Sequence, residues 1–338
     1  MPDIRADYTL PDYRTFELAG DHYACGWAMG QVTELRVIQR RANQSLAREF
    51  AEACAEVVRR EHAPLLREYR GYAEAQGRPW EDVLPHFSLH HPAGVVGGCS
   101  TLVWRSEDGH VMVARNYDFT TDQRARHLIR SAPPGVQPVL GANASLIGGR
   151  YDGVNGAGLF VSLHLVRTDE PARVGPAVPF HLAPRIVLES CATAHQARQR
   201  LMSMLLMHSF NYVVADAREF FAVEVHPTLR RAREGDGALV TTNHYQHADM
   251  QPFHGRRQGA NSRRRAERLW ELWAGRHGDP WAWGQRALAE HDGPICGHDR
   301  HLATLWSLVA DLSARRIAYC LGAPCETPFV EMPWPARA

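Results

Sequence analysis

The pattern of apolar residues changes at Cys99, and this change constrains the fold more than any other feature of the sequence. Over residues 16 to about 75 apolar side chains recur at helical spacing, and from Ala24 onward no proline interrupts them before Pro64. A further helical stretch covers residues 80–89. From Cys99 the apolar runs are short and strand-like. The sequence therefore predicts a helix-rich segment, residues 1–98, followed by a sheet-containing part, residues 99–338.

Strand-like runs alternate with helical patterns throughout residues 99–338. The expected strands cover residues 100–104, 111–115, 144–147, 159–165, 212–215, 220–225 and 239–242, and a last hairpin joins 304–311 to 314–321. The expected helices cover residues 179–189, 194–206, 263–274 and 281–291. Clusters of strands between clusters of helices predict an α+β fold with stacked sheets flanked by helices, in one compact domain overall.

Composition and charge narrow the classes of function. The chain has 338 residues, of which 45% are hydrophobic and 22% charged, as expected of a folded globular protein. Its 38 basic and 37 acidic side chains leave a net charge of +1, so no overall field attracts nucleic acid, and we expect none as a partner. The acidic N-terminus lacks an apolar stretch, and no later run approaches the roughly 18 residues of a membrane span. We expect a cytoplasmic protein without a membrane partner.

The seven cysteines are odd in number and irregular in spacing, which argues against a disulfide framework. Cys296, His298 and His301 resemble metal ligands in their spacing. However, there is no C-x-x-C pair, and the sequence does not indicate where the remaining ligands would come from. We expect a structural cysteine and surface histidines here, with no metal and no cofactor.

Two glycines, Gly97 and Gly98, lead directly into Cys99 at the start of a strand. A thiol that attacks its own preceding carbonyl requires backbone freedom at that point, and Gly98 provides it. Cleavage of the bond between Gly98 and Cys99 would give Cys99 a free α-amino group. With a pKa near 7.7–8.0, this amine can act as the base for its own thiol. The alternative is a buried cysteine that begins a strand.

Polar residues follow the next predicted strand. The turn at residues 107–110 and the strand after it form a hairpin that returns residues 115–119 beside Cys99. Arg115 and Asp118 follow Cys99 by 16 and 19 residues. A guanidinium and a carboxylate there would control the protonation of the amine, orient the thiol and bind a polar substrate group. An ion pair at a strand end is the structural alternative.

Together with several glycine-rich motifs, these residues resemble a known family, the cysteine-type N-terminal-nucleophile (Ntn) hydrolases. The similarity is to the isopenicillin-N acyltransferase-like (acyl-CoA:6-aminopenicillanate acyltransferase) branch, related to choloylglycine hydrolase and to acid amidase and ceramidase. It rests on residues 18–20, 26–30, 98–99, 115–118, 153–159, 242–244 and 322–325, and so covers most of the chain. The resemblance implies a four-layer αββα sandwich of two mainly antiparallel sheets and self-cleavage between Gly98 and Cys99. It also implies a mature heterodimer of residues 1–98 and 99–338, with higher oligomers left open.

The resemblance also assigns roles to individual residues. It implies that Cys99 is the nucleophile, that Arg115 and Asp118 support its thiol and amine, and that Asn243 donates to the oxyanion. It further implies an arginine on a late helix, which either Arg263 or Arg265 supplies. The remaining expected substrate-binding side chains are Tyr117, Tyr245 and Arg263, and His164 is expected to be structural.

These residues predict an enzyme that cleaves a small linear amide through a thioester acyl-enzyme. The first alternative is an acyltransferase that moves the acyl group of an amide or thioester to an amine. Hydrolysis is the simpler reaction because a bare acyl-enzyme meets water by default, whereas transfer requires a seat for the amine. A non-catalytic binding protein with the same fold is the second alternative. A papain-like protease is disfavoured, because nineteen histidines make a chance cysteine–histidine match easy.

Overall fold

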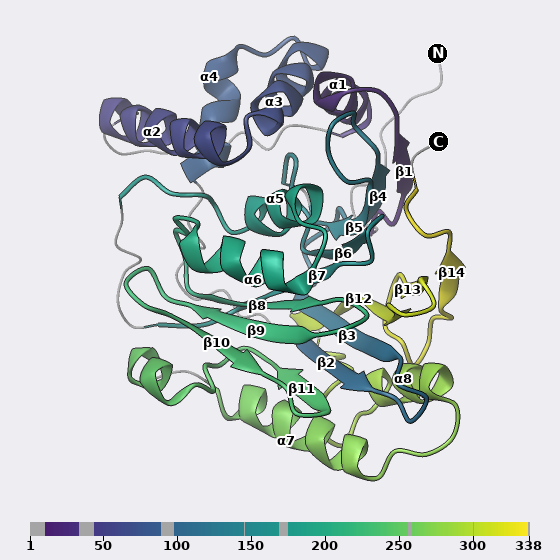
Figure 1. The fold of residues 1–338 in the computed structure, drawn as a ribbon. Helices are drawn as coiled ribbons and strands as arrows, with labels where there is room; N and C mark the ends of the chain where they lie inside the picture. Colours follow the sequence, from purple (N-terminus) through teal and green to yellow (C-terminus); the bar gives the residue numbers. More distant parts are fainter. Residues whose placement is uncertain are drawn as a thin grey trace.

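A computed structural model describes residues 11–33, 44–88, 98–144, 146–168, 175–255, 259–299 and 301–336. Gly97, part of the predicted cleavage motif, lies outside the described residues. Two sheets stack on one another, with helices outside each of them (Figure 1). The predicted α+β class is therefore confirmed, as is the arrangement of two stacked sheets between helical layers.

The larger sheet, within the described residues, has the strand order β1-β4-β5-β6-β7-β8-β9-β10. Its strands are β1 (Thr15–Leu18), β4 (His127–Ser131), β5 (Val139–Asn143), β6 (Asp152–Asn155), β7 (Phe160–Leu165), β8 (Phe210–Ala215), β9 (Phe220–Val225) and β10 (Arg230–Glu234). All neighbours are antiparallel except β1 and β4, which are parallel. From β4 to β10 each strand pairs with the next one along the chain, through short connections except between β7 and β8, where residues 166–209 include two helices.

The smaller sheet has the order β11-β2-β3-β12-β13-β14 and is antiparallel throughout. Its strands are β2 (Ser100–Arg105), β3 (Val111–Thr120), β11 (Ala238–Thr241), β12 (Leu302–Asp311), β13 (Arg316–Cys320) and β14 (Val330–Met332). The predicted hairpin of β2 and β3 is present, with Ser100 opposite Asn116 and Thr101 opposite Arg115. This register brings the polar end of β3 beside Cys99.

Helices cover the outer face of each sheet (Figure 1). In the larger sheet, α5 (Leu182–Ser190) contacts β6 and β7, and α6 (Ala194–Ser203) contacts β8 and β9. In the smaller sheet, α7 (Ala260–Ala274) contacts β2 and β11, and α8 (Pro280–Leu288) contacts β3 and β12. The four helices agree with the sequence prediction in position, within a few residues at their ends.

The alternation of side chains along β2 and β3 divides the core in two. Val103 and Val113 belong to the main core, which also contains residues of the larger sheet. Leu102 and Ala114 face the other way, into a core shared with α7 and α8. Cys99 belongs to the main core, on the side of the hairpin that faces the larger sheet.

The front segment contains β1, α1 (His22–Val32), α2 (Gln44–His62), α3 (Pro64–Ala75), α4 (Trp80–Val83) and the 3-10 helix η1 (Leu84–Ser88). Helix α1 is capped at its start, because the Asp21 side chain accepts a hydrogen bond from the Ala24 amide at 2.9 Å. The first residues of the expected helix-rich stretch instead form strand β1, which extends the larger sheet beside β4.

A buried ionic network fastens the front segment to α5. Ring nitrogens of His22 and His62 lie 2.9 and 2.6 Å from Glu189 Oε2, and Arg185 Nε donates to Glu189 Oε1 at 2.6 Å. Arg185 also donates to Glu68 at 3.2 Å. Burial alone would raise the pKa of Glu189, but Arg185 and the two imidazoles hold it well below its usual value. Removing residues 1–98 would therefore take both imidazoles from Glu189 and the Glu68 carboxylate from Arg185, and leave these two residues of α5 paired with each other.

Two sequence expectations fail around β5. The strand expected at residues 144–147 is wrong: β5 ends at Asn143, whose side-chain amide donates to the carbonyls of Leu146 and Gly149 and so fixes a turn. Strands β5 and β6 were not predicted. They contact so closely that a Cβ at Gly141 would lie 2.4 Å from the carbonyl oxygen of Asp152.

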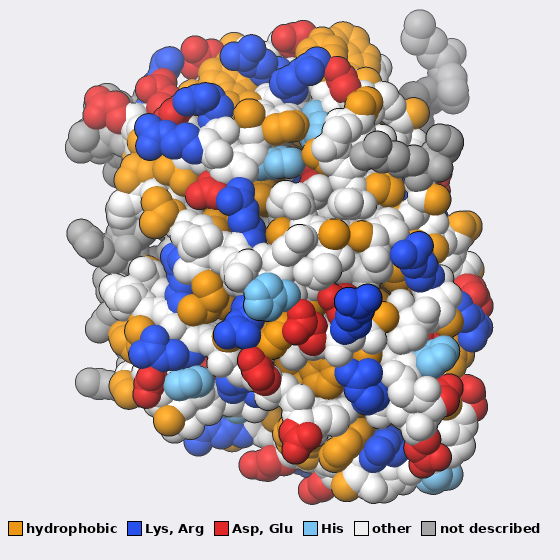
Figure 2. All heavy atoms as spheres, viewed as in Figure 1, with side chains coloured by type: hydrophobic (Ala, Val, Ile, Leu, Met, Phe, Trp, Pro, Cys, Tyr) orange, Lys and Arg blue, Asp and Glu red, His pale blue; other side chains and the backbone are white. Residues whose placement is uncertain are grey.

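The surface agrees with the balanced composition. Basic and acidic side chains are interspersed over the face drawn in Figure 2, without a large patch of one sign. Among the helices of the described residues, none has the length and apolar character needed to cross a membrane.

Candidate active site

Cys99 lies directly before β2 with 2% of its surface exposed. Burial raises the pKa of its thiol, while the positive charge of Arg115 acts in the opposite direction. The carbonyl oxygen of Cys99 accepts a hydrogen bond from Arg265 Nη1 at 2.6 Å. The residue is thus held between two buried guanidinium groups from different elements, β3 and α7.

Arg115 occupies the side of β3 that faces the larger sheet. Its Nε donates to Asp152 Oδ2 at 2.7 Å and its Nη2 donates to the Leu163 carbonyl at 2.9 Å. Its Nη1 lies 3.3 Å from Thr101 Oγ1 and 3.2 Å from His164 Nε2. Burial and the neighbouring Arg115 lower the pKa of His164 well below its usual value, so the imidazole is neutral and Nε2 accepts. The three guanidinium nitrogens of Arg115 are thus all in contact with protein groups.

Asp152, on β6, is a site residue that sequence reasoning missed. Besides Arg115 it accepts hydrogen bonds from Trp306 Nε1 at 2.8 Å and Tyr319 Oη at 3.3 Å. The signal in the sequence was present, since the predicted arginine on a buried strand requires a buried anion. Asp152 was not found because β6 itself was not predicted.

Asp118 lies on the opposite side of β3, toward α7. Its Oδ1 accepts a hydrogen bond from Thr304 Oγ1 at 2.8 Å, and its carbonyl accepts from the Gly98 amide at 3.1 Å. Burial raises the pKa of the Asp118 carboxyl to about 7, against the lowering effects of Arg265, the Thr304 hydrogen bond and Arg115. A carboxyl with this pKa both takes up and releases a proton near neutral pH.

Asn243 follows β11 and is tied to α7. Its Oδ1 accepts from Arg265 Nη2 at 2.8 Å, and its backbone amide donates to Ser262 Oγ at 2.9 Å. One side-chain N–H donates to the Leu165 carbonyl at 2.9 Å. Because an amide nitrogen carries two hydrogens, this bond leaves a second donor on the same atom.

Arg265 joins Cys99 to Asn243 and resolves the choice between the arginines of α7. It donates to the Cys99 carbonyl, to Ser100 Oγ at 2.8 Å and to Asn243. Arg263 is exposed on the same helix. The late-helix arginine that contacts Cys99 is therefore Arg265.

The two predicted aromatic residues lie in different surroundings. Tyr117 stacks on Trp306 with ring centroids 4.0 Å apart, and Arg115 lies 5.8 Å from its ring centre. Tyr245 donates its hydroxyl to the Val225 carbonyl at 2.6 Å and packs in a small separate core. Of these two, Tyr117 therefore lies beside Arg115, whose charge acts to lower the pKa of the Cys99 thiol.

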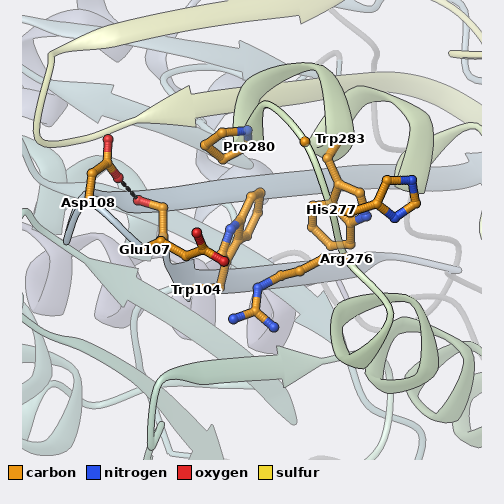
Figure 3. A pocket seen from close by; sticks show the side chains of 9 residues that line it. Trp104, Glu107, Asp108, Arg276, His277, Pro280 and Trp283 are labelled. Carbon is orange, nitrogen blue, oxygen red and sulfur yellow. Dashed lines mark hydrogen bonds between the residues drawn. The ribbon is translucent and has the colours of Figure 1, made fainter.

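A surface hollow of about 280 Å³ lies at the other end of β2 from Cys99. Figure 3 shows Trp104 near the centre, with Glu107 and Asp108 on one side of it and Trp283, Arg276 and His277 on the other. Because Trp104 is close to the end of β2 and Cys99 precedes its start, this hollow does not open onto the thiol.

Two groups of side chains in the described residues have the ligand types and proximity that a metal requires. One is His22, His62 and Glu189, in which the Glu189 carboxylate is already paired with Arg185. The other joins His291, Cys296, His298 and Cys325. The sequence did not indicate further ligands for Cys296 and His298, but the fold brings Cys325 and His291 beside them, whereas His301 is not in the group.

Comparison with solved structures supports the fold. An N-acylethanolamine-hydrolyzing acid amidase orthologue from Caenorhabditis elegans is 18% identical, with a TM-score of 0.50 over 63% of this chain and 93% of that one. Penicillin V acylase from Agrobacterium tumefaciens is 15% identical, with a TM-score of 0.40 over 66% and 83%. A mutant conjugated bile acid hydrolase from Clostridium perfringens is 12% identical, with a TM-score of 0.42 over 70% and 97%.

A family model described as acyl-coenzyme A:6-aminopenicillanic acid acyl-transferase matches residues 104–326. The match begins near the end of β2 and ends just after Cys325, so it includes both sheets except β1, β14 and the first four residues of β2, together with the four outer helices; Cys99 precedes it. The resemblance read from the sequence is confirmed: the chain belongs to the acyl-coenzyme A:6-aminopenicillanic acid acyl-transferase family.

Proposed function

We propose that the chain is a self-processing cysteine amidohydrolase with Cys99 as its nucleophile. The observation that carries the proposal is the position of Cys99, which follows Gly98 and is linked to Asn243 through Arg265, between Arg115 and Asp118. Four buried polar residues from three separate parts of the chain are costly to maintain around an inert cysteine.

Maturation begins at the bond between Gly98 and Cys99. The thiol sulfur attacks the Gly98 carbonyl carbon, a thioester forms, and the C–N bond breaks as the nitrogen takes up a proton. Water then hydrolyses the thioester, which leaves a Gly98 carboxylate and restores the thiol beside a free Cys99 amine. Asp118 suits the transfer of the proton, since its pKa of about 7 lets it donate and reaccept at neutral pH.

Substrate cleavage repeats this chemistry on an external acyl group. The Cys99 amine takes the thiol proton, the sulfur attacks the amide carbonyl, and the second N–H of Asn243 stabilises the oxyanion. The amine product leaves with the proton, and water releases the acid from the acyl-enzyme. Arg115 and Arg265 hold the nucleophile and Asn243 in place without leaving their protein partners.

The substrate class that we propose is a small linear amide. The acid amidase orthologue from Caenorhabditis elegans has a name that describes hydrolysis of an acyl amide, and it shares the fold. Acyl transfer is the second candidate, because the matching family model is described as an acyltransferase. The two reactions share every step up to the acyl-enzyme and differ in the acceptor, water or an amine.

We expect the processed protein to remain a heterodimer of residues 1–98 and 99–338. The network of His22, His62 and Glu68 with Arg185 and Glu189 joins the two chains through buried charges. Loss of the front chain would take Glu68 and both imidazoles away from the buried pair of Arg185 and Glu189. The cytoplasmic location remains a prediction.

The first test is the intact mass of the protein under denaturing conditions. Wild type is expected to give two fragments that break between Gly98 and Cys99 and that co-elute under native conditions, whereas Cys99→Ala gives one full-length chain. Cys191→Ser, at another buried cysteine, is the matched control and should be processed normally. A single full-length chain in wild type would contradict self-processing and favour a non-catalytic protein. Amide hydrolysis and transfer are then compared by presenting an acyl amide with water alone and with added amines.

Gly98→Ala is expected to slow processing about tenfold or more. A Cβ at Gly98 would lie 2.8 Å from Asp118 Oδ2 and 2.9 Å from Asp118 Cβ, closer than real Cβ contacts, so the carboxyl has to move away. A tenfold change in rate corresponds to about 1.4 kcal/mol in the barrier. The measurement is the fraction cleaved against time. Gly175→Ala is the control for folding, because Gly175 is exposed, its φ is not left-handed, and a Cβ there would meet no atom within 4 Å. Equal rates for Gly98→Ala and wild type would show that Asp118 need not stay beside Gly98.

A further inference from the structure

The cluster of His291, Cys296, His298 and Cys325 lies on two loops of the smaller sheet. His291, Cys296 and His298 come from the connection between α8 and β12, and Cys325 comes from the connection between β13 and β14. Their ligand atoms all lie within 4.8 Å of one another. Family membership assigns no function to these four residues, and the proposed mechanism uses none of them.

The distances in the cluster suit a tetrahedral ion. Cys296 Sγ lies 3.8 Å from Cys325 Sγ, and His298 Nε2 lies 3.2 and 3.0 Å from these two sulfurs. Zinc at about 2.3 Å from sulfur and about 2.0 Å from nitrogen gives tetrahedral edges of about 3.8 Å between sulfurs and about 3.5 Å between sulfur and nitrogen. The sulfur pair already has this spacing, and the imidazole needs to withdraw by only a few tenths of an ångström.

The surroundings of the cluster orient the ligands. His298 Nδ1, the ring nitrogen that does not face the sulfurs, lies 3.9 Å from Glu326 Oε1. A carboxylate on that side of a metal-bound imidazole fixes the ring and its tautomer. The His291 and His298 rings meet edge to face with centroids 5.1 Å apart, which brings the fourth ligand to the same point. Cys325 sits in a turn closed by the Glu326 and Thr327 amides on the Ala323 carbonyl.

We propose that His291, Cys296, His298 and Cys325 form a structural zinc site. Two thiolates and two imidazoles favour Zn²⁺ over hard cations such as Mg²⁺ or Ca²⁺, which prefer oxygen. Binding releases the two thiol protons to solvent, and the resulting site, a divalent cation with two thiolates, is neutral. A disulfide between the same cysteines requires neither imidazole, so the histidines distinguish the zinc site from a redox pair.

The site supports the neighbourhood of Asp118. Gly297, between two of the ligands, donates its amide to Thr304 Oγ1 at 2.9 Å, and Thr304 Oγ1 donates to Asp118 Oδ1 at 2.8 Å. The Thr304 amide in turn donates to the Gly297 carbonyl at 3.0 Å. Zinc bound by the residues on either side of Gly297 would hold this loop, and through it the threonine that contacts the Asp118 carboxyl.

The experiment measures zinc in the full-length protein, purified under reducing conditions without chelator. We expect about one zinc per chain by mass spectrometry of the metal in wild type, in Cys191→Ser and in His301→Ala. Cys325→Ser and His298→Ala are expected to lose at least nine-tenths of it. After removal of zinc, Co²⁺ added to wild type should give thiolate-to-cobalt charge-transfer bands and the intense visible bands of a tetrahedral complex.

Because Cys325 and His298 are on the surface, these variants should fold, and circular dichroism checks this directly. Zinc far below one per chain in folded wild type, together with no tetrahedral cobalt spectrum, would overturn the proposal. A disulfide between Cys296 and Cys325 in peptides mapped without reductant would also overturn it. Equal zinc contents in Cys325→Ser and wild type would place the metal elsewhere.

Discussion

Replacing Arg265 with methionine is expected to slow processing before Cys99 by more than about 100-fold, the range seen when one preorganised donor is removed from an oxyanion site. Arg265 donates to the Cys99 carbonyl, to Ser100 and to Asn243, so its loss frees both the nucleophile and the oxyanion donor. Its charge also lowers the pKa of Asp118. The variant should therefore process best at a higher pH than wild type does.

The arginine run provides matched controls for this experiment. Arg263 and Arg264 precede Arg265 on α7 but are exposed, so Arg263→Met and Arg264→Met change the same residue type without touching Cys99. The measurement is the fraction of chain cleaved against time and pH, by denaturing mass spectrometry, with the unfolding midpoint recorded for each variant. Arg265→Lys keeps the charge and should retain part of the rate. Similar rates in all three methionine variants would exclude a special role for Arg265.

The sequence predicts well where local signals act alone. The β2–β3 hairpin follows from its turn and alternating residues, and it fixes Arg115 and Asp118 near Cys99. The four outer helices follow from apolar spacing. Such features depend on residues close to one another along the chain.

The sequence predicts poorly where a residue depends on a distant partner. Strands β5 and β6 are hidden by glycines at positions 141 and 153, which the tight pairing of the two strands requires. Because β6 was not predicted, Asp152 was not expected in the site, although it forms a buried ion pair with Arg115. Whether Arg263 or Arg265 contacts Cys99 depends on the rotation of α7 about its axis. The contact between Cys296 and Cys325 depends on the fold of two loops that are distant in the sequence. Each is a contact across the chain that spacing alone does not specify.

The buried charges of the site also explain why its stability should depend on pH. Arg115 is paired with Asp152 on one side of β3, whereas Asp118 on the other side contacts Thr304, a neutral group. The attraction of Arg265 and Arg115 does not overcome the loss of solvent around Asp118, so its pKa is raised to about 7. The buried Asp118 carboxyl therefore lowers the stability of the fold at neutral pH. Its packing does not explain why it is retained, whereas the proposed proton transfer does.

Asp118→Asn is therefore expected to stabilise the fold at alkaline pH. The unfolded carboxyl loses its proton near pH 3.8 and the folded one near 7, so wild type loses stability as pH rises between these values. About three units correspond to up to about 4 kcal/mol. Asparagine removes this penalty and keeps an oxygen for Thr304. The same change should slow processing by more than about 100-fold, because the amide cannot transfer a proton.

Chemical unfolding in the unprocessed Cys99→Ala background tests the sign. Relative to Cys99→Ala alone, the added Asp118→Asn should raise the free energy of unfolding most at about pH 8, and the difference should shrink toward zero at about pH 4. Asp122→Asn is the control, because that carboxylate is exposed and its change should have little effect at either pH. If Asp118→Asn is instead destabilising at about pH 8, the attraction of the ionised Asp118 carboxylate to Arg265 and Arg115 outweighs the cost of removing it from solvent. The carboxylate would then be permanently ionised, and it could not carry the proton that maturation requires.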